Sequence, residues 1–120
     1  MATILIIDDE PAILESLGIF LRKMNHTVYQ AATGKQGLKQ FEQQHPDIVI
    51  LDIHLPDLNG LEILRRIQQH EWLAKVIMIT AYQDMDTTIQ AMKDGAYDYI
   101  HKPLDIEEIE NAVDQAFQVL

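Results

Sequence analysis

The sequence contains no cysteine and is poor in basic residues. The absence of cysteine excludes a disulfide framework and a thiolate metal site. Lysine and arginine together number 9, against 19 aspartates and glutamates, so the formal net charge is -10. Because a phosphate backbone requires a basic patch, we expect no direct nucleic-acid binding by this domain.

Long hydrophobic runs are missing as well. No apolar run approaches the roughly 20 residues that a membrane-spanning helix needs, so we expect no membrane association. The opening MATILIIDDE has no basic region and is interrupted early by acids, which is not the pattern of a signal peptide. We therefore expect a cytoplasmic protein.

Short strand-forming runs alternate with amphipathic helical patterns along the 120 residues. Strands are predicted at 3–7, 26–31, 48–51, 75–79 and 97–101. Helices are predicted at 11–24, 34–44, 59–70, 84–94 and 105–119. The length and a hydrophobic content of 48% fit a single globular domain over residues 1–120.

This alternation predicts an α/β fold. Three of the strand runs are almost wholly apolar, as expected for parallel strands that are covered on both faces. Right-handed crossovers would then build a (βα)5 flavodoxin-like three-layer sandwich, with a parallel five-stranded sheet of order 2-1-3-4-5. In the last two helices, apolar stripes are expected to face the sheet. They are Met85, Ile89 and Met92 in the fourth helix, and Ile106, Ile109, Val113, Ala116 and Phe117 in the fifth.

Acidic residues follow two of the predicted strands. Asp8 and Asp9 come after the first strand, and Asp52 ends the third. These two strands are neighbours in the expected sheet, so the three carboxylates should converge at one edge. Thr80 and Lys102 follow the fourth and fifth strands at the same edge.

Three close carboxylates cannot all stay ionised without a cation, and one lysine cannot balance them. Oxygen ligands without cysteine favour a hard divalent ion, best Mg²⁺, with Mn²⁺ as a substitute. A cation beside Lys102 and the Thr80 hydroxyl suits a phosphoryl group. Asp52, at the centre of the acids, is the best candidate for a nucleophile that forms an aspartyl phosphate.

Four segments, ILIIDDEP, IVILDIHLPDLNGLEIL, VIMITAY and GAYDYIHKPLD, resemble the receiver (response-regulator) domain of bacterial two-component signalling. They follow the order of that family, each at a strand end, and the similarity covers essentially the whole chain. The resemblance implies that Asp52 is the phosphoacceptor. It also implies that Asp9, Asp52 and the backbone carbonyl of His54 bind Mg²⁺ directly. Asp8 would hold a metal-bound water.

The same resemblance assigns the residues of a switch. Thr80 would be the switch hydroxyl and Tyr99 the switch aromatic. Lys102 would bind the phosphate, followed by Pro103 in the bent Lys-Pro link of the family. For Tyr99, simple packing in an edge strand is the alternative interpretation.

The function implied by the resemblance is a phosphorylation-activated signalling switch and not an enzyme, although the domain would assist its own phosphotransfer and dephosphorylation. A sensor histidine kinase would phosphorylate Asp52. The face formed by helix 84–94, strand 97–101 and helix 105–119 would then change shape to control an output, expected to be transcription. We expect a homodimer through the two helices of that face.

The segment GAYDYIHKPLDIEEIENAV is most like receivers of enhancer-binding activators that work with the alternative sigma factor. A stand-alone receiver and a receiver on a histidine kinase are the alternatives. We accordingly expect the chain to form the N-terminal module of a longer regulator.

Three other functions fit less well. A Mg²⁺-dependent aspartate-nucleophile phosphatase or hydrolase needs a second Asp two residues after the nucleophile, where this chain has His54. A flavin carrier of the flavodoxin kind needs a phosphate loop of backbone N–H groups after the first strand, where this chain has DDEP. A receiver that has lost phosphorylation is disfavoured by the complete set of acids, hydroxyl and lysine.

Overall fold

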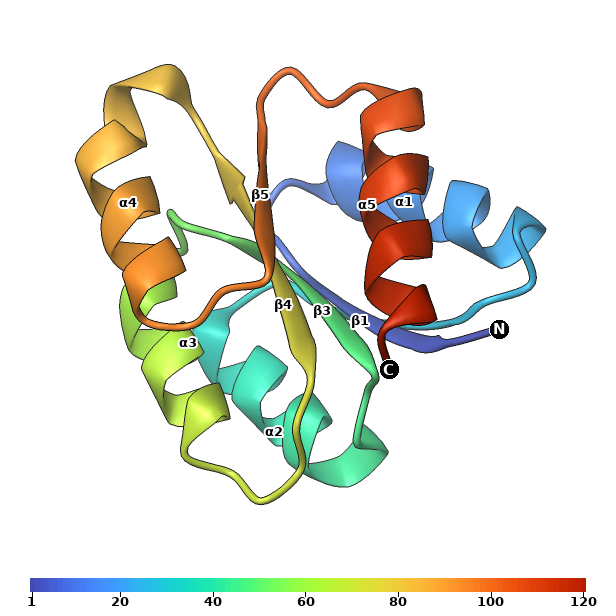
Figure 1. Ribbon diagram of the computed structural model, residues 1–120, viewed down its shortest axis with the longest axis horizontal. Coiled ribbons are helices and arrows are strands. Elements are labelled where there is room, and N and C mark those ends of the chain that lie inside the picture. The colour runs from blue at the N-terminus through green and yellow to red at the C-terminus, as the bar shows by residue number, and fades with distance from the viewer.

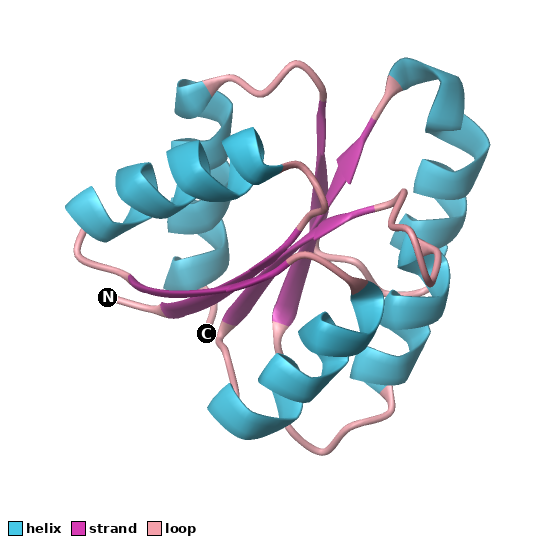
Figure 2. Cartoon of the chain, turned by 180° about the vertical axis from the view of Figure 1, so that it is seen from behind, coloured by secondary structure: helices cyan, strands magenta, loops and turns pink.

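The computed structural model describes residues 1–120 and contains one parallel sheet between two layers of helices (Figure 1, and from behind in Figure 2). The strands are β1 (Thr3–Ile7), β2 (Thr27–Ala31), β3 (Ile48–Asp52), β4 (Lys75–Thr80) and β5 (Asp98–His101). The helices are α1 (Pro11–Lys23), α2 (Gly34–Gln44), α3 (Gly60–Gln68), α4 (Met85–Lys93) and α5 (Ile106–Gln118), with a short 3₁₀ turn, η1 (Tyr82–Asp84). The strand order β2-β1-β3-β4-β5, with all neighbours parallel, confirms the predicted flavodoxin-like topology.

Side chains alternate across the sheet and build a separate core on each face. In β1, Ile4 and Ile6 pack in the core that includes α1 and α5, whereas Leu5 and Ile7 pack in the core that includes α2, α3 and α4. Figure 1 shows these two helical layers on opposite sides of the sheet. Because both faces are covered, consecutive strand positions are apolar, which explains the unbroken hydrophobic runs.

The turn between β3 and α3 holds the chain after Asp52 in place. Asn59 caps α3, since its Oδ1 accepts a hydrogen bond from the Glu62 N–H at 2.9 Å. The Gly60 N–H donates to the Ile53 carbonyl at 2.7 Å. A Cβ on Gly60 would lie 2.7 Å from Ile53 Cα, so only glycine fits here. The start of α3 therefore packs directly on the residue that follows Asp52.

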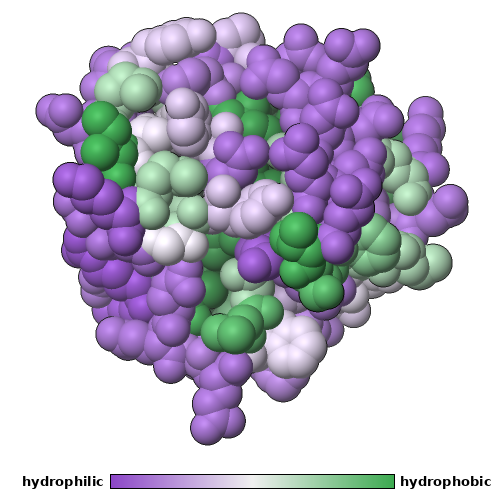
Figure 3. All heavy atoms as spheres, viewed as in Figure 1, coloured by the Kyte–Doolittle hydropathy of each residue, from purple (hydrophilic) through white to green (hydrophobic).

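The predicted orientation of α4 is wrong. Met85, Ile89 and Met92 are 37%, 50% and 37% exposed, whereas Thr88 and Ala91 are buried. These two small residues face inward, which lets the helix pack closely against α3 and β4. The larger apolar stripe consequently faces solvent, and Figure 3 shows hydrophobic atoms at the surface over α4.

The stripe of α5 is shifted from the predicted one at its margins. Ile109, Val113 and Ala116 are buried as expected, but Ile106 and Phe117 are exposed. Ala112 is buried in addition, and with the other three buried residues it forms a stripe with the spacing of one helix face.

Candidate functional site at the carboxyl end of the sheet

The ends of four strands bring polar residues to one edge of the sheet. Asp8 follows β1 and Asp52 ends β3, and these strands are paired neighbours. Thr80 ends β4, and Lys102 follows β5. Because all strands are parallel, these residues lie together at the carboxyl edge, where α/β sheets of this kind bind ligands.

One group of three potential metal ligands converges in the molecule. Carboxylate oxygens of Asp8, Glu10 and Asp52 all lie within 4.8 Å of one another. Asp8 and Asp52 are buried, and Glu10 is exposed. Asp9 lies outside this group of three, but it lines a cavity in front of Asp52 together with Glu10. Sequence reasoning did not single out Glu10, although its place directly after two acids and before Pro11, at the start of α1, was an available signal.

Lys102 is the only lysine or arginine that lines the cavity. Its Nζ lies 2.8 Å from Glu10 Oε1 and 3.3 Å from Asp52 Oδ2. Its peptide bond to Pro103 is cis. Since Lys102 carries one positive charge, it does not balance the three clustered acids when all of them are ionised.

Burial disfavours the ionised form of both buried acids. Burial raises the pKa of Asp8 to about 6, helped by the charge of Asp52 and opposed by the hydrogen bond from the Glu10 N–H. Burial also raises the pKa of Asp52, against the lowering effects of the His54 N–H and Lys102. For Lys102, burial lowers the pKa, but the neighbouring carboxylates outweigh burial and the pKa is raised. The lysine thus stays charged, while a further cation would relieve the repulsion between the acids.

The donor set fits a hard divalent cation. Asp8 Oδ2 is buried and has no hydrogen-bond partner, although Oδ1 accepts from the Glu10 N–H at 2.9 Å. An unpartnered buried carboxylate oxygen is costly, and a cation or its water would satisfy it. The donors are all oxygens, which Mg²⁺ prefers. Asp8, Glu10 and Asp52, with Asp9 beside them, are the residues that can hold such an ion.

The cavity in front of Asp52 has a volume of about 380 Å³. Its lining residues are Asp9, Glu10, Asp52, His54, Ala81, Gln83, Asp84 and Lys102, and the buried Asp8 is not among them. The His54 N–H donates to Asp52 Oδ1 at 3.2 Å, whereas its imidazole Nε2 lies 2.8 Å from Asp84 Oδ1. The imidazole therefore pairs with Asp84 at the rim, while the backbone of His54 contacts Asp52.

Neither of the two predicted switch residues lines the cavity. Thr80 is 1% exposed, and its Oγ1 is 3.0 Å from Nδ1 of His101. Tyr99 is 38% exposed, and its ring meets the His101 ring edge-on at a centroid distance of 5.3 Å. His101 lies within the segment GAYDYIHKPLD, but the resemblance assigned it no role. In the structure it connects Thr80 with Tyr99.

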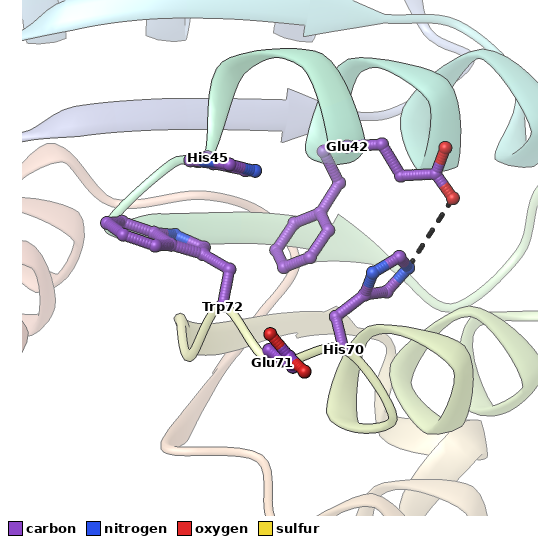
Figure 4. Close-up of a pocket in the computed structure, with 6 residues that line it drawn as sticks. Glu42, His45, His70, Glu71 and Trp72 are labelled. Atoms are coloured by element: carbon purple, nitrogen blue, oxygen red, sulfur yellow. Dashed lines mark ion pairs between the residues drawn. The ribbon is translucent and has the colours of Figure 1, made fainter.

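A larger cavity, of about 550 Å³, lies at the opposite edge of the sheet, between the end of α2 and the segment before β4 (Figure 4). His70 points toward Glu42, with 3.6 Å between Nε2 and Oε1, and His45 stacks on Trp72 with the ring centroids 5.0 Å apart. The Trp72 indole N–H donates to the Pro46 carbonyl at 2.6 Å. These groups are engaged in pairs and do not converge as the acids of the first cavity do.

No helix of the protein combines the length and the apolar character needed to cross a membrane.

Known proteins match this chain along nearly its whole length. Residues 4–114 match the response regulator receiver domain. Regulatory protein AtoC of Escherichia coli (strain K12) is 34% identical over 116 residues, which are 97% of this chain and 25% of AtoC. Sporulation initiation phosphotransferase F of Bacillus subtilis (strain 168) is 37% identical over 110 residues, which are 92% of this chain and 89% of that protein.

A solved structure agrees with the sequence matches. The crystal structure of a response regulator receiver domain protein from Clostridium thermocellum has a TM-score of 0.93 and 35% identity, covering 98% of this chain and 95% of that chain. The chain spans a quarter to a half of the length of several curated relatives. The topology, the acids at the strand ends and these matches lead to one conclusion: the chain belongs to the receiver domain family of response regulators.

Proposed function

We propose that this domain is a phosphorylation-activated switch in which Asp52 accepts a phosphoryl group from a sensor histidine kinase, with Mg²⁺. The proposal is carried by the position of Asp52, a buried acid at a strand end whose Oδ2 lies 3.3 Å from Lys102 Nζ. Carboxylate oxygens of Asp8 and Glu10 lie within 4.8 Å of the Asp52 carboxylate. A nucleophile, the cation of Lys102 and oxygen ligands for a metal therefore lie together at one edge of the sheet.

The transfer would use the ionised carboxylate of Asp52. One of its oxygens attacks the phosphorus of a phosphohistidine, so that a P–O bond forms while the P–N bond breaks. The electron pair of the broken bond leaves with the imidazole, which takes up a proton. Lys102 stabilises the negative charge on the phosphoryl oxygens. As the resemblance implies, Asp9, Asp52 and the His54 carbonyl would hold Mg²⁺ with Asp8 beside them, while Glu10 pairs with Lys102. The ion would supply further positive charge to the same oxygens.

Phosphorylation would be read out through β4 and β5. The phosphoryl oxygens attract the Thr80 hydroxyl, which lies outside the cavity in this structure. The space that Thr80 vacates would admit Tyr99, so the α4–β5–α5 face changes shape as a population shift between two states. The exposed apolar stripe of α4 supports our expectation of a homodimer through α4 and α5.

We further infer that the output is control of transcription. The inference rests on the resemblance to receivers of enhancer-binding activators and on the match to Regulatory protein AtoC, of which this chain spans 25%. With a net charge of -10, the receiver would leave nucleic-acid binding to another part of the regulator.

Incubation with Mg²⁺ and acetyl phosphate tests the proposal. Intact-mass spectrometry should show the gain of one phosphoryl group, and Asp52→Asn should abolish it. Asp86→Asn, which neutralises an exposed acid on α4, is the matched control and should keep the gain. No gain, or a gain that survives Asp52→Asn, would contradict the proposal. Steady release of phosphate from phosphate esters without a phosphorylated protein would point to an aspartate-nucleophile phosphatase.

A further inference from the structure

His101, the last residue of β5, lies directly opposite Thr80, the last residue of β4. Nδ1 of its imidazole is 3.0 Å from Oγ1 of Thr80. The Lys102 N–H donates to the Thr80 carbonyl at 2.7 Å, so the backbone holds the two side chains next to each other. Whichever of the two groups donates, this contact keeps the Thr80 hydroxyl beside β5.

Two tyrosines hold the imidazole of His101 in this orientation. Tyr82, from η1, stacks on the ring at a centroid distance of 4.2 Å and an interplanar angle of 21°. Tyr99 meets the ring edge-on at 5.3 Å and 68°. The tyrosines are 70% and 38% exposed, so His101 links the buried hydroxyl of Thr80 to aromatic side chains at the surface.

We propose that His101 is a positioning residue that restrains Thr80 in the unphosphorylated protein, a role that rests on the proposed function of Asp52. Thr80 does not line the cavity in front of Asp52, so its hydroxyl has to move away from β5 to reach a phosphoryl group on Asp52. To bond a phosphoryl oxygen, the hydroxyl must leave His101. The restraint therefore lowers the population of the activated state, and its release frees the imidazole between Tyr82 and Tyr99.

The size of the effect follows from the strength of one neutral hydrogen bond. Exchange of such a bond for solvent or another partner changes the equilibrium between the restrained and the activated state about fivefold. The restraint by His101 lowers the apparent affinity for a ligand that selects the activated state by the same factor, because that state is less populated than it would be without the bond.

Two substitutions separate the hydrogen bond from the packing of the ring. His101→Phe keeps an aromatic ring between the tyrosines and removes Nδ1. His101→Asn removes the ring and keeps a hydrogen-bonding group near the position of Nδ1. With Mg²⁺ present, His101→Phe should bind the phosphoryl analogue beryllofluoride about fivefold more tightly than the wild type, and His101→Asn about as tightly as the wild type. Affinity for Mg²⁺ alone should be the same in all three proteins.

Nitrogen NMR of the imidazole tests the same contact in the wild-type protein. The Nδ1 resonance of His101 should shift when beryllofluoride binds, and Thr80→Val, which lacks the hydroxyl, should give the same shift without ligand. An unchanged resonance, or equal beryllofluoride affinity of His101→Phe and wild type, would overturn the role of His101 while phosphorylation of Asp52 stands. Failure of wild-type Asp52 to gain a phosphoryl group would refute the proposed function itself.

Discussion

At the scale of single residues, the two buried acids of the site, Asp8 and Asp52, oppose folding until a cation joins them. Asp8 shows this most clearly, because its Oδ2 is buried without a partner and burial raises its pKa to about 6. A group whose pKa is raised in the folded protein stabilises the fold while it is protonated. The ionised form at neutral pH therefore lowers the free energy of unfolding.

Asp8→Asn should raise the free energy of unfolding at about pH 7 by roughly 1–3 kcal/mol when divalent cations are absent. The amide keeps an oxygen for the Glu10 N–H and carries no charge. The pKa of Asp8 rises from 3.8 to about 6 on folding, so the penalty is absent below 3.8, grows as the pH rises and is complete above about 6. Urea unfolding at about pH 7 and about pH 4.5 measures the gain, which should shrink at the lower pH. A variant no more stable than the wild type at either pH would refute this.

Protonation of His26 lowers the stability of the fold, whereas protonation of Asp8 raises it. Its Nδ1 accepts a hydrogen bond from the Ala2 N–H at 2.9 Å, and the side chain is buried beside Phe117. Burial lowers the pKa of His26, and the charged amino terminus lowers it further against the opposing charge of Asp114. The folded protein thus disfavours the imidazolium form.

Stability should fall as the pH drops through 6.5, because the unfolded chain then binds a proton at His26 that the folded chain does not. His26→Asn, whose side-chain oxygen can accept the same backbone hydrogen bond, should lose less stability between about pH 7.5 and about pH 5.5. The difference between the two proteins is limited to about 1.4 kcal/mol per pH unit. Urea titrations of both proteins measure it, and equal losses would show that His26 is not the titrating group.

At the scale of elements, the strands were predictable from sequence and the orientation of α4 was not. Apolar runs that alternate with helical patterns indicate buried parallel strands, so the strand positions followed from sequence. The order 2-1-3-4-5 was the favoured arrangement for five such strands, and the structure has it. In α4, either Met85, Ile89 and Met92 or the smaller Thr88 and Ala91 could face the sheet. Hydrophobicity favours the first set, but the space between α3, α4 and β4 suits the second.

Substitutions on the two faces of α4 should have very different costs. Ile89→Lys should change the free energy of unfolding by less than about 0.5 kcal/mol, because Ile89 is 50% exposed. Ala91→Lys should destabilise the protein by about 3 kcal/mol or more, since Ala91 is 0% exposed and the position has no partner for a charge. Denaturant titration compares them, and similar losses for both would mean that the larger stripe is buried.

At the scale of the whole molecule, the sheet gathers residues from distant parts of the chain into one cavity. Sequence predicted that Asp8, Asp9, Asp52 and Lys102 would meet there, because the ends of parallel strands share an edge. It did not predict the ion pair of Glu10 with Lys102 or the contact of His101 with Thr80. Both depend on side-chain directions that tertiary packing sets, and no local pattern in the sequence carries that information.

The central claim is that Asp52 carries the phosphoryl group, and locating that group is its most direct test. Borohydride reduces an aspartyl phosphate to homoserine, which peptide mass mapping can assign to one position. After treatment with acetyl phosphate and Mg²⁺, the conversion should occur at position 52 alone and should be lost when Mg²⁺ is omitted. Conversion at Asp8, Asp9 or Glu10, or at no residue, would contradict the account.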